Sequence, residues 1–310
     1  MAKPKIFIDG EHGTTGLQIQ ERLSGRTDIE QLTLAHADRH SKEKRAEMLR
    51  AADIAILCLP DDASRESVLL AKGAPTRFID ASSAHRTAPN WAFGFAELTK
   101  GQPEIIAKAQ YVSNPGCYST GAIALLRPLI EAGALPADYP LTINAVSGYS
   151  GGGKQLIAQM EDASREDAIS ANLFAYALGL QHKHVPEIIT RSGLTRRPIF
   201  TPSVARFAQG MLVNVPLHLD MLNGTQDAQS IHAALADHYA GQNVVQVADL
   251  AECAGMARLD PEALNGTNIM RLYVFGEAST GHVNLVAQLD NLGKGASGAA
   301  VQNLELMIKA

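Results

Sequence analysis

The chain has 310 residues, and this length predicts two domains because most domains span roughly 100–200 residues. Its net charge of −5 argues against a non-specific nucleic-acid binder, which needs clustered positive charge. Its three cysteines are too few for a disulfide framework and favour a reducing compartment. No uncharged apolar stretch approaches the roughly 18 residues of a membrane span, and the start lacks the apolar run of a secretory signal. We therefore expect a cytoplasmic protein without a membrane partner.

Apolar strands alternate with helix-forming segments in the first third of the chain. Strands are expected over 5–9, 29–35, 53–59, 77–81 and 111–112, and helices over 17–23, 42–50 and 63–72. This βαβαβ order predicts a parallel, doubly wound sheet.

The pattern changes at about Cys117. Strands are expected over 141–147, 207–217, 270–276 and 282–289, and helices over 120–132 and 295–307. Pro128 predicts a kink or an early stop in the first of these helices. The strands suggest a separate antiparallel or mixed sheet, so a second domain is expected from about Cys117 to about Asn291.

A glycine loop follows the first strand and opens the first helix. Its spacing is Gly-x-x-Gly-x-x-Gly at Gly10, Gly13 and Gly16, rather than the more common Gly-x-Gly-x-x-Gly. Backbone N–H groups and the helix dipole at such a site bind a diphosphate. The alternative is a tight strand-to-helix turn without a ligand.

The segment after the second strand indicates the type of nucleotide. An acid that would bind the ribose hydroxyls of NAD is not at the expected position. Arg39, Ser41, Lys42 and Lys44 lie there instead, and their cations and hydroxyl favour the 2′-phosphate of NADP. A solvated helix start is the alternative.

Cys117 is the candidate nucleophile. It lies just ahead of the predicted 120–132 helix, and a thiol at a helix N-terminus has a depressed pKa. Gly116 allows a sharp turn beside the sulfur. The alternative is a small buried hydrophobe, which suits Cys58 in its apolar strand, whereas Cys253 has no supporting context.

His182 and His184 are two residues apart, beside Lys183 and Pro186. Such a pair fits general acid–base chemistry, an anion site or a metal site. A metal would take Cys117 as its third ligand, but hydride or acyl chemistry needs none, so no metal is expected. A structural role for the histidines is the alternative.

Two further segments are candidates for ligand contacts. Residues 147–154 contain consecutive glycines and Lys154, which suit a phosphate or the nicotinamide end of a cofactor. The segment is not a Walker loop, because Gln155 replaces the required hydroxyl residue, and a flexible surface loop is the alternative. Arg86 follows a strand end and is positioned to face a ligand.

Together these motifs resemble the N-acetyl-γ-glutamyl-phosphate reductase family in its short form (type 2), which belongs with the aspartate-semialdehyde dehydrogenases. The resemblance spans nearly the whole chain through residues 10–16, 80–86, 114–118, 147–151, 182–187 and 294–303. Its most specific pieces are Asn114-Pro115-Gly116-Cys117-Tyr118 and His182-Lys183-His184-Val185-Pro186-Glu187. Two segments depart from the pattern: Glu11-His12, where many relatives carry Ala or Ser, and Asp80-Ala81-Ser82-Ser83, where longer relatives have Leu-Ser-Ala-Asp.

The resemblance implies a mechanism. The Cys117 thiolate attacks the acyl phosphate of N-acetyl-L-glutamyl 5-phosphate, phosphate leaves, and hydride from NADPH reduces the resulting thioester to N-acetyl-L-glutamate 5-semialdehyde. His182 is the implied acid–base, while His184, Tyr176 and Arg86 line the substrate site. The implied NADP contacts are Gly10, Gly13, Thr14, Thr15, Gly16, Arg39, Gly148 and Gly295.

The resemblance also implies the architecture. The fold is α/β, with a Rossmann-type doubly wound parallel sheet in residues 1–116 that the segment 292–310 completes. Residues 117–291 form an α+β catalytic and dimerisation domain. The implied pathway is arginine biosynthesis, and the implied assembly is a homodimer or homotetramer.

Three alternatives remain open. An aspartate-semialdehyde dehydrogenase uses the same cysteine chemistry on a substrate with a free amino group. A non-catalytic NADP(H)-sensing protein would not need Cys117 and His182 in their motifs. A cysteine hydrolase would leave the glycine loop unexplained.

Overall fold

The computed structural model describes residues 2–309, which divide into two compact units. The first comprises residues 2–96, 100–116 and 296–309, and the second comprises residues 97–99 and 117–295. Residues 97–99 and 292–295 thus pack with the second unit, whereas the sequence assigned them to the first. The reason lies in contacts that sequence patterns do not reveal: the Leu98 carbonyl accepts from Nε2 of His238 at 3.1 Å, and a Cβ on Gly295 would lie 2.9 Å from Cβ of Cys117.

A parallel sheet forms the centre of the first unit. Its strands are β1 (Lys5–Asp9), β2 (Glu30–Leu32), β3 (Ile54–Leu57), β4 (Arg77–Asp80), β5 (Ala92–Phe93) and β6 (Tyr111–Ser113), in the order β2-β1-β3-β4-β6-β5. Its helices are α1 (Thr14–Leu23), α2 (Lys42–Ala51), α3 (Asp61–Leu70), α4 (Gln102–Lys108) and α10 (Gly298–Ile308), with a 3-10 turn at His36–Asp38. The predicted doubly wound, Rossmann-type sheet is confirmed.

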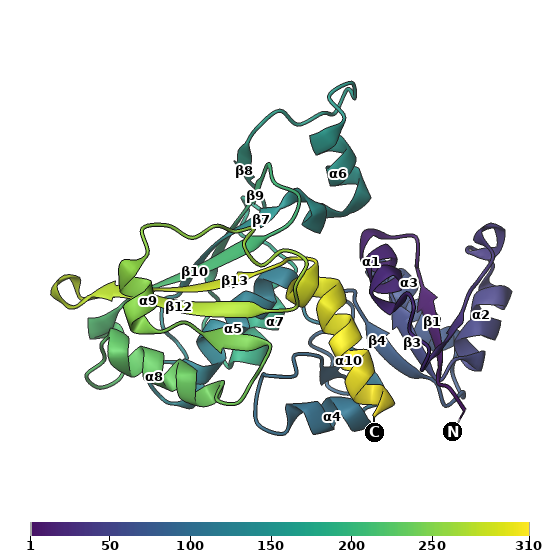
Figure 1. Cartoon of the computed structure of the whole chain (residues 1–310), viewed down its shortest axis with the longest axis horizontal. Helices are drawn as coiled ribbons and strands as arrows, with labels where there is room; N and C mark the ends of the chain where they lie inside the picture. Colours follow the sequence, from purple (N-terminus) through teal and green to yellow (C-terminus); the bar gives the residue numbers. More distant parts are fainter. Residues whose placement is uncertain (1, 310) are drawn as a thin grey trace. The chain divides into compact units, whose positions relative to one another are not determined.

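Successive side chains along the strands point to opposite faces of this sheet, and apolar residues are buried on both faces. Ile6 and Ile8 point to one face, where α1, α4 and α10 pack, and Phe7 points to the other face, where Leu49 of α2 packs. Figure 1 shows α10, in yellow, lying beside α4. The C-terminal helix therefore completes the core of the first unit.

The strand order creates a switch point at β1. This strand pairs with β2 on one side and β3 on the other, both in parallel. Ligands of open α/β sheets bind outside the carboxyl ends of the strands at such a point. Strand β2 is shorter than the predicted 29–35, because this edge strand is largely exposed and has few apolar contacts to extend it.

A mixed sheet forms the centre of the second unit. Its strands are β7 (Thr142–Gly148), β8 (Leu173–Ala175), β9 (Ile199–Ala205), β10 (Met211–His218), β11 (Val245–Val247), β12 (Met270–Glu277) and β13 (His282–Leu289), in the order β11-β12-β13-β10-β7-β9-β8. Its helices are α5 (Cys117–Glu131), α6 (Gly153–Glu161), α7 (Val185–Ser192), α8 (Ala228–His238) and α9 (Leu250–Gly255). Helical turns lie at Tyr149–Gly152, Leu219–Met221 and Ala278–Thr280, and the π-helix η5 spans Gly293–Ser297.

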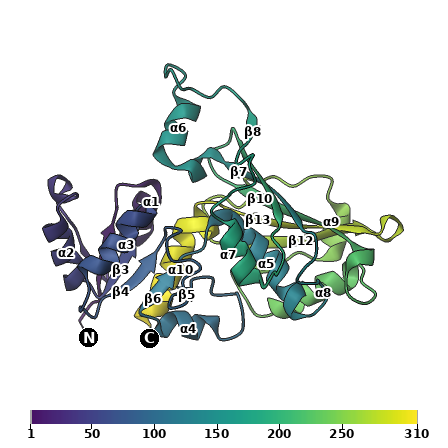
Figure 2. The ribbon, with the colours of Figure 1, turned by 180° about the vertical axis from the view of Figure 1, so that it is seen from behind.

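Helix α5 is largely buried within this unit. It packs on β10 and β13 and lies beside α7, as Figure 2 shows. Gly121 permits the close approach, because a Cβ there would lie 2.9 Å from Cγ2 of Val213. Of the two outcomes expected at Pro128, a kink or an early stop, the early stop is wrong: the helix continues to Glu131, and the Ala132 amide donates to the Pro128 carbonyl at 2.9 Å.

Two predicted boundaries shift in this unit. The strand expected over 207–217 begins only at Met211, because Gly210 turns the chain with a φ of +113°. The helix expected from residue 295 begins at Gly298, after the π-helix. Within residues 2–309, every helix is too short or too polar to span a membrane.

Candidate active site

A cavity of about 360 Å³ lies at the switch point of the first unit. The loop after β1, the segment after β2 and the end of β3 line it. The residues that matter here are Gly10, His12, Gly13, Arg39, His40 and Cys58. The cavity therefore occupies the position where doubly wound sheets bind nucleotides.

The glycine loop is built for close backbone approach. Gly10 has a φ of +91°, and a Cβ there would lie 2.4 Å from the carbonyl oxygen of Cys58. A Cβ at Gly16 would lie 2.5 Å from the Gly10 carbonyl oxygen, and the Gly13 amide donates to that same oxygen at 3.0 Å. The buried Oγ1 of Thr14 has no hydrogen-bond partner within residues 2–309. A diphosphate at the start of α1 fits this loop and would give Thr14 an acceptor.

A guanidinium and several imidazoles gather at the rim of the cavity. Nη1 of Arg39 lies 2.9 Å from Nδ1 of His36 and donates to its carbonyl at 2.8 Å. The ring of His12 lies 4.7 Å from that of His36. The Arg39 charge, partial desolvation and the nearby imidazoles of His12 and His40 lower the pKa of His36. Such a cluster favours an anion, and the 2′-phosphate of NADP fits it.

The carboxylates near this cavity already have cationic or amide partners. Arg45 donates to both oxygens of Asp9, at 3.2 and 3.0 Å, and Ser67 donates to Asp9 at 2.8 Å. The Gln20 amide donates to Glu11 at 2.5 Å. The other oxygen of Glu11 lies 3.7 Å from Nε2 of His12. Among the described residues, the Arg39 guanidinium is instead hydrogen-bonded to His36 and not to a carboxylate.

Cys117 is the first residue of α5 and is partly exposed. The N-terminal dipole of a helix stabilises a thiolate at this position. By contrast, burial and nearby carboxylates raise the pKa of the Cys58 thiol to about 12, and Cys253 is buried. Of the three cysteines, only Cys117 combines exposure with an activating position.

His182 faces Tyr176 across a short contact. Nε2 of His182 lies 3.1 Å from the Tyr176 hydroxyl, and the backbone amide of His184 donates to Nδ1 of His182 at 3.1 Å. Because Nδ1 accepts, a neutral His182 carries its proton on Nε2. The structure thereby assigns the tautomer and presents an Nε2–H donor toward Tyr176.

Electrostatics link this pair to Cys117. Burial raises the pKa of the Tyr176 hydroxyl, and the charge of a Cys117 thiolate raises it further. Burial, Tyr176 and Cys117 likewise raise the pKa of Tyr118, whose hydroxyl donates to the Ser203 carbonyl at 2.9 Å. The charge of Cys117 thus acts on the Tyr176 hydroxyl, which in turn contacts His182, so the three predicted residues lie near one another in the second unit.

His184 is buried and precedes α7, whose first turn contains Pro186. Its ring lies 4.7 Å from that of His182 and 5.9 Å from that of Tyr118. No group of three His, Cys, Asp or Glu side chains in the described part of the chain is arranged to hold a metal ion. His184 therefore stands behind His182.

Other predicted residues occupy structural positions. Arg86 is buried and donates to the Asn114 carbonyl at 3.0 Å and to the Ala81 carbonyl at 3.1 Å. The Gly148 amide donates to the Gly210 carbonyl at 2.9 Å, and a Cβ at Gly148 would lie 2.4 Å from the Ala208 carbonyl oxygen. These contacts fix the chain ahead of Cys117 and after β7.

Sequence reasoning missed the positions of Tyr118, His12 and His36. Tyr118 directly follows Cys117 in the cysteine motif, so the sequence itself shows that the two residues are neighbours. The two histidines are separated by 24 positions, and only the fold brings their rings together.

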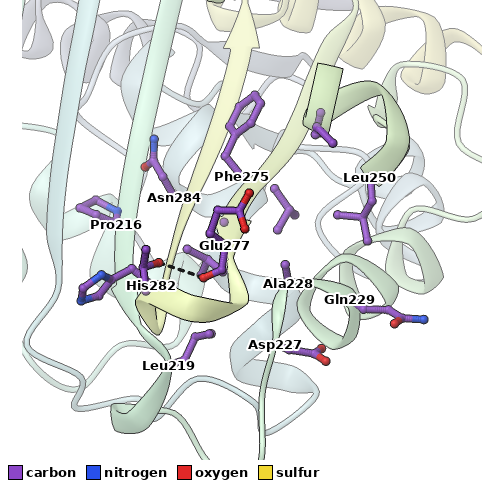
Figure 3. Close-up of a pocket in the computed structure, with 16 residues that line it drawn as sticks. Pro216, Leu219, Asp227, Ala228, Gln229, Leu250, Phe275, Glu277, His282 and Asn284 are labelled. Atoms are coloured by element: carbon purple, nitrogen blue, oxygen red, sulfur yellow. Dashed lines mark hydrogen bonds between the residues drawn. The ribbon is translucent and has the colours of Figure 1, made fainter. Parts of the chain in front are cut away.

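A further cavity, of about 750 Å³, lies between α8, α9 and the ends of β12 and β13. Figure 3 shows Phe275, Glu277 and His282 on these strands and Gln229 on α8 around it. None of the predicted site residues lines this cavity. It therefore lies apart from the predicted chemistry.

Comparison with known proteins assigns the class. Residues 11–107 match the NAD binding domain of semialdehyde dehydrogenases, and residues 117–291 match their dimerisation domain. The chain therefore belongs to the semialdehyde dehydrogenase family. The N-acetyl-gamma-glutamyl-phosphate reductase of Brucella anthropi is 63% identical over 307 residues, which cover 99% of each protein. Within the family, the chain is thus a member of the N-acetyl-gamma-glutamyl-phosphate reductases, which are oxidoreductases.

Solved structures agree on the fold. A probable aspartate-semialdehyde dehydrogenase from Pseudomonas aeruginosa has a TM-score of 0.73 at 18% identity, over 99% of both chains. An aspartate semialdehyde dehydrogenase from Candida albicans, solved with NADP, has a TM-score of 0.64 at 12% identity, over 99% of this chain and 98% of that one.

Proposed function

We propose that the protein reduces N-acetyl-L-glutamyl 5-phosphate with NADPH, giving N-acetyl-L-glutamate 5-semialdehyde and phosphate. The observation that carries the proposal is the placement of Cys117 at the start of α5, in the electrostatic neighbourhood of the Tyr176–His182 pair. The Brucella relative bears the name of this reaction. We place the reaction in arginine biosynthesis and in the cytoplasm.

Cys117 supplies the nucleophile. Its sulfur forms a bond to the acyl carbon while the carbon–oxygen bond to phosphate breaks, which leaves a thioester and free phosphate. The helix dipole favours the thiolate before attack. When bound, NADPH supplies the hydride that a thioester carbonyl accepts far more readily than a carboxylate does.

His182 supplies a proton. The net reaction consumes one proton, and His182 can supply it as an imidazolium, which returns to the neutral ring when its Nε2, 3.1 Å from the Tyr176 hydroxyl, gives the proton up. Proton donation from a positioned imidazole lowers the barrier for release of the aldehyde. Tyr176 orients the ring, and His184 packs behind it. His184, Tyr176 and Arg86 stay predicted substrate contacts.

The first unit is the proposed cofactor domain. Gly10, Gly13, Thr14, Thr15 and Gly16 would hold the diphosphate, and Arg39 with His36 would hold the 2′-phosphate. Arg39→Ala is expected to weaken NADPH binding about tenfold and to leave NADH binding within twofold, because only NADPH carries the 2′-phosphate. Equal losses for both nucleotides in a fluorescence titration would contradict this assignment. Gly148 and Gly295 stay predicted cofactor contacts.

The second unit is the proposed catalytic and dimerisation domain. A face of its sheet carries half-exposed side chains from β10, β12 and β13, among them Leu212, Phe275 and Asn284, beside a shallow cavity of about 300 Å³. We assign this face to pairing of two copies, as a homodimer or within a homotetramer. Phe275→Asp should lower the mass measured by light scattering, and an unchanged mass would exclude this face.

Acyl transfer to Cys117 is directly testable. The protein is mixed with N-acetyl-L-glutamyl 5-phosphate without NADPH, and its intact mass is measured. One acyl adduct that hydroxylamine removes and that Cys117→Ala lacks is expected. Phosphate release without an adduct, or an adduct retained in Cys117→Ala, would contradict the proposed nucleophile.

A further inference from the structure

The loop after β13 is polar and fully buried. Asp290 and Asn291 are at most 1% exposed, as is Lys294. The Asp290 carboxylate accepts the amides of Gly266 and Leu292, each at 2.9 Å, and its carbonyl accepts the Gly295 amide at 3.0 Å. A buried loop of this kind keeps its place only because its polar groups are bonded.

An ion pair anchors the loop at Lys294. Nζ of Lys294 lies 2.6 Å from Oε2 of Glu97, and the two side chains are 1% and 2% exposed. Burial lowers the pKa of Lys294, and the Glu97 charge opposes that shift. Removing two charges from water is costly, so a buried pair is weak evidence for stability and suggests a role in fixing one geometry.

The partner of Lys294 is itself held in place. The carbonyl of Leu98, next to Glu97, accepts from Nε2 of His238 on α8 at 3.1 Å. Burial and the charge of Glu97 raise the pKa of Tyr239, whose hydroxyl donates to the Ala124 carbonyl of α5 at 2.9 Å. Glu97 is therefore fixed against the α5–α8 layer of the second unit.

The next residue in the loop contacts the nucleophile. A Cβ built on Gly295 would lie 2.9 Å from Cβ and 3.3 Å from Cα of Cys117, and 3.1 Å from the Asp290 carbonyl oxygen. Gly295 therefore packs directly on Cys117. Any movement of Lys294 is transmitted through one peptide unit to this contact.

We propose that the buried Lys294–Glu97 ion pair is the positioning device for Cys117, because it holds Gly295 against the cysteine and fixes the thiol at the start of α5. The proposal rests on the assignment of Cys117 as the nucleophile. Lys294 and Glu97 are positioning residues, since the proposal has them act on Cys117 through Gly295.

The test replaces the pair without leaving a lone charge. The double variant Lys294→Met with Glu97→Met keeps similar volumes, and such apolar replacements of buried ion pairs are often neutral or stabilising. Gly295→Ala is the second variant, because it disturbs Cys117 while the pair stays intact. Tyr273→Phe is the control, since it breaks a buried hydrogen bond to Gln288 of 2.7 Å elsewhere in the same unit.

Three readouts separate positioning from stability. Alkylation of Cys117 by iodoacetamide, followed by peptide mass spectrometry over a pH range, reports the thiol without any substrate. Turnover gives kcat and KM, and fluorescence gives NADPH affinity. Both test variants are expected to lose about 10- to 100-fold in kcat and in alkylation rate, as for a misplaced catalytic group. NADPH affinity should stay within twofold in the double variant, whose two residues are not among the predicted cofactor contacts. Tyr273→Phe should match the parent in kcat.

Parent-like alkylation and kcat in a folded double variant would overturn the proposal. If the double variant does not fold, the alkylation rate of Gly295→Ala decides, because Gly295 is also a predicted cofactor contact and its kcat would report both roles. A parent-like alkylation rate in that variant would overturn the proposal equally. A parent protein without reductase activity would instead contradict the proposed function, while the alkylation rates would still test the positioning of Cys117.

Discussion

Tyr176→Phe tests the hydroxyl that orients the proton donor and that also shares a hydrogen bond with Tyr118. The substitution keeps the ring, whose centroid lies 5.6 Å from that of His182, and removes only the hydroxyl 3.1 Å from Nε2. Burial and the Cys117 charge raise the pKa of this hydroxyl, so it stays protonated at neutral pH. Loss of the hydroxyl therefore changes the orientation of the His182 ring rather than the charge of the site.

The magnitude follows from the nature of the bond. A neutral hydrogen bond contributes about 0.5–1.5 kcal/mol net, which converts to an expected fall in kcat of about 2- to 13-fold. Removing the donor itself with His182→Asn should cost about 10²- to 10⁴-fold. The ratio of the two effects tells whether Tyr176 orients the donor or donates the proton.

The assay is steady-state turnover of both variants, with NADPH affinity measured separately. Tyr176→Phe should leave NADPH affinity unchanged and lose at most about 13-fold in kcat. A loss for Tyr176→Phe as large as that for His182→Asn would refute the assignment of His182 as donor. An unchanged kcat would show that the contact has no part in turnover.

Three further predictions concern the nucleophile and the fold. Cys117→Ser should abolish turnover while fluorescence titration shows NADPH binding intact; near-normal turnover would exclude Cys117. Asp80 is fully buried and accepts from Ser64, His85 and both the amide and hydroxyl of Ser82. Burial alone would raise its pKa, but the hydrogen bonds from His85 and Ser82 outweigh burial and lower it. Asp80→Asn should therefore cost about 2–4 kcal/mol in urea unfolding at pH 7. That cost should shrink only below about pH 4, as the parent loses the contribution of the ionised Asp80. A cost that stays constant down to pH 3 would contradict the stabilising role assigned to the ionised carboxylate. Ala177 has a φ of +51°, so Ala177→Gly should stabilise by up to about 1 kcal/mol in thermal unfolding, whereas a clear loss would show that the strain is relieved elsewhere.

Local patterns predict the first unit well. The buried alternation of Ile6, Phe7 and Ile8 fixes β1 and both of its faces, and the glycine spacing marks the turn into α1. The extent of β2 was overestimated, because edge strands depend on neighbours that the sequence does not show.

The second unit is less visible in the sequence. The sequence analysis does not predict strands β8, β9 and β11 or helices α6 to α9. Strands β8 and β11 have only three residues each, which is too few to show a period. The motifs nevertheless named Cys117, Tyr176 and His182, whose closeness the structure describes. Lys294 and Glu97 are 197 positions apart, so only tertiary structure reveals their contact.

The most direct test of the central claim runs the reaction backwards. NADP⁺ reduction is followed by absorbance with N-acetyl-L-glutamate 5-semialdehyde or with aspartate semialdehyde, each with and without phosphate. The account predicts reduction with the acetylated aldehyde only, and only when phosphate is present, because phosphate must cleave the Cys117 thioester. Phosphate-dependent activity with aspartate semialdehyde instead, or activity without phosphate, would contradict it.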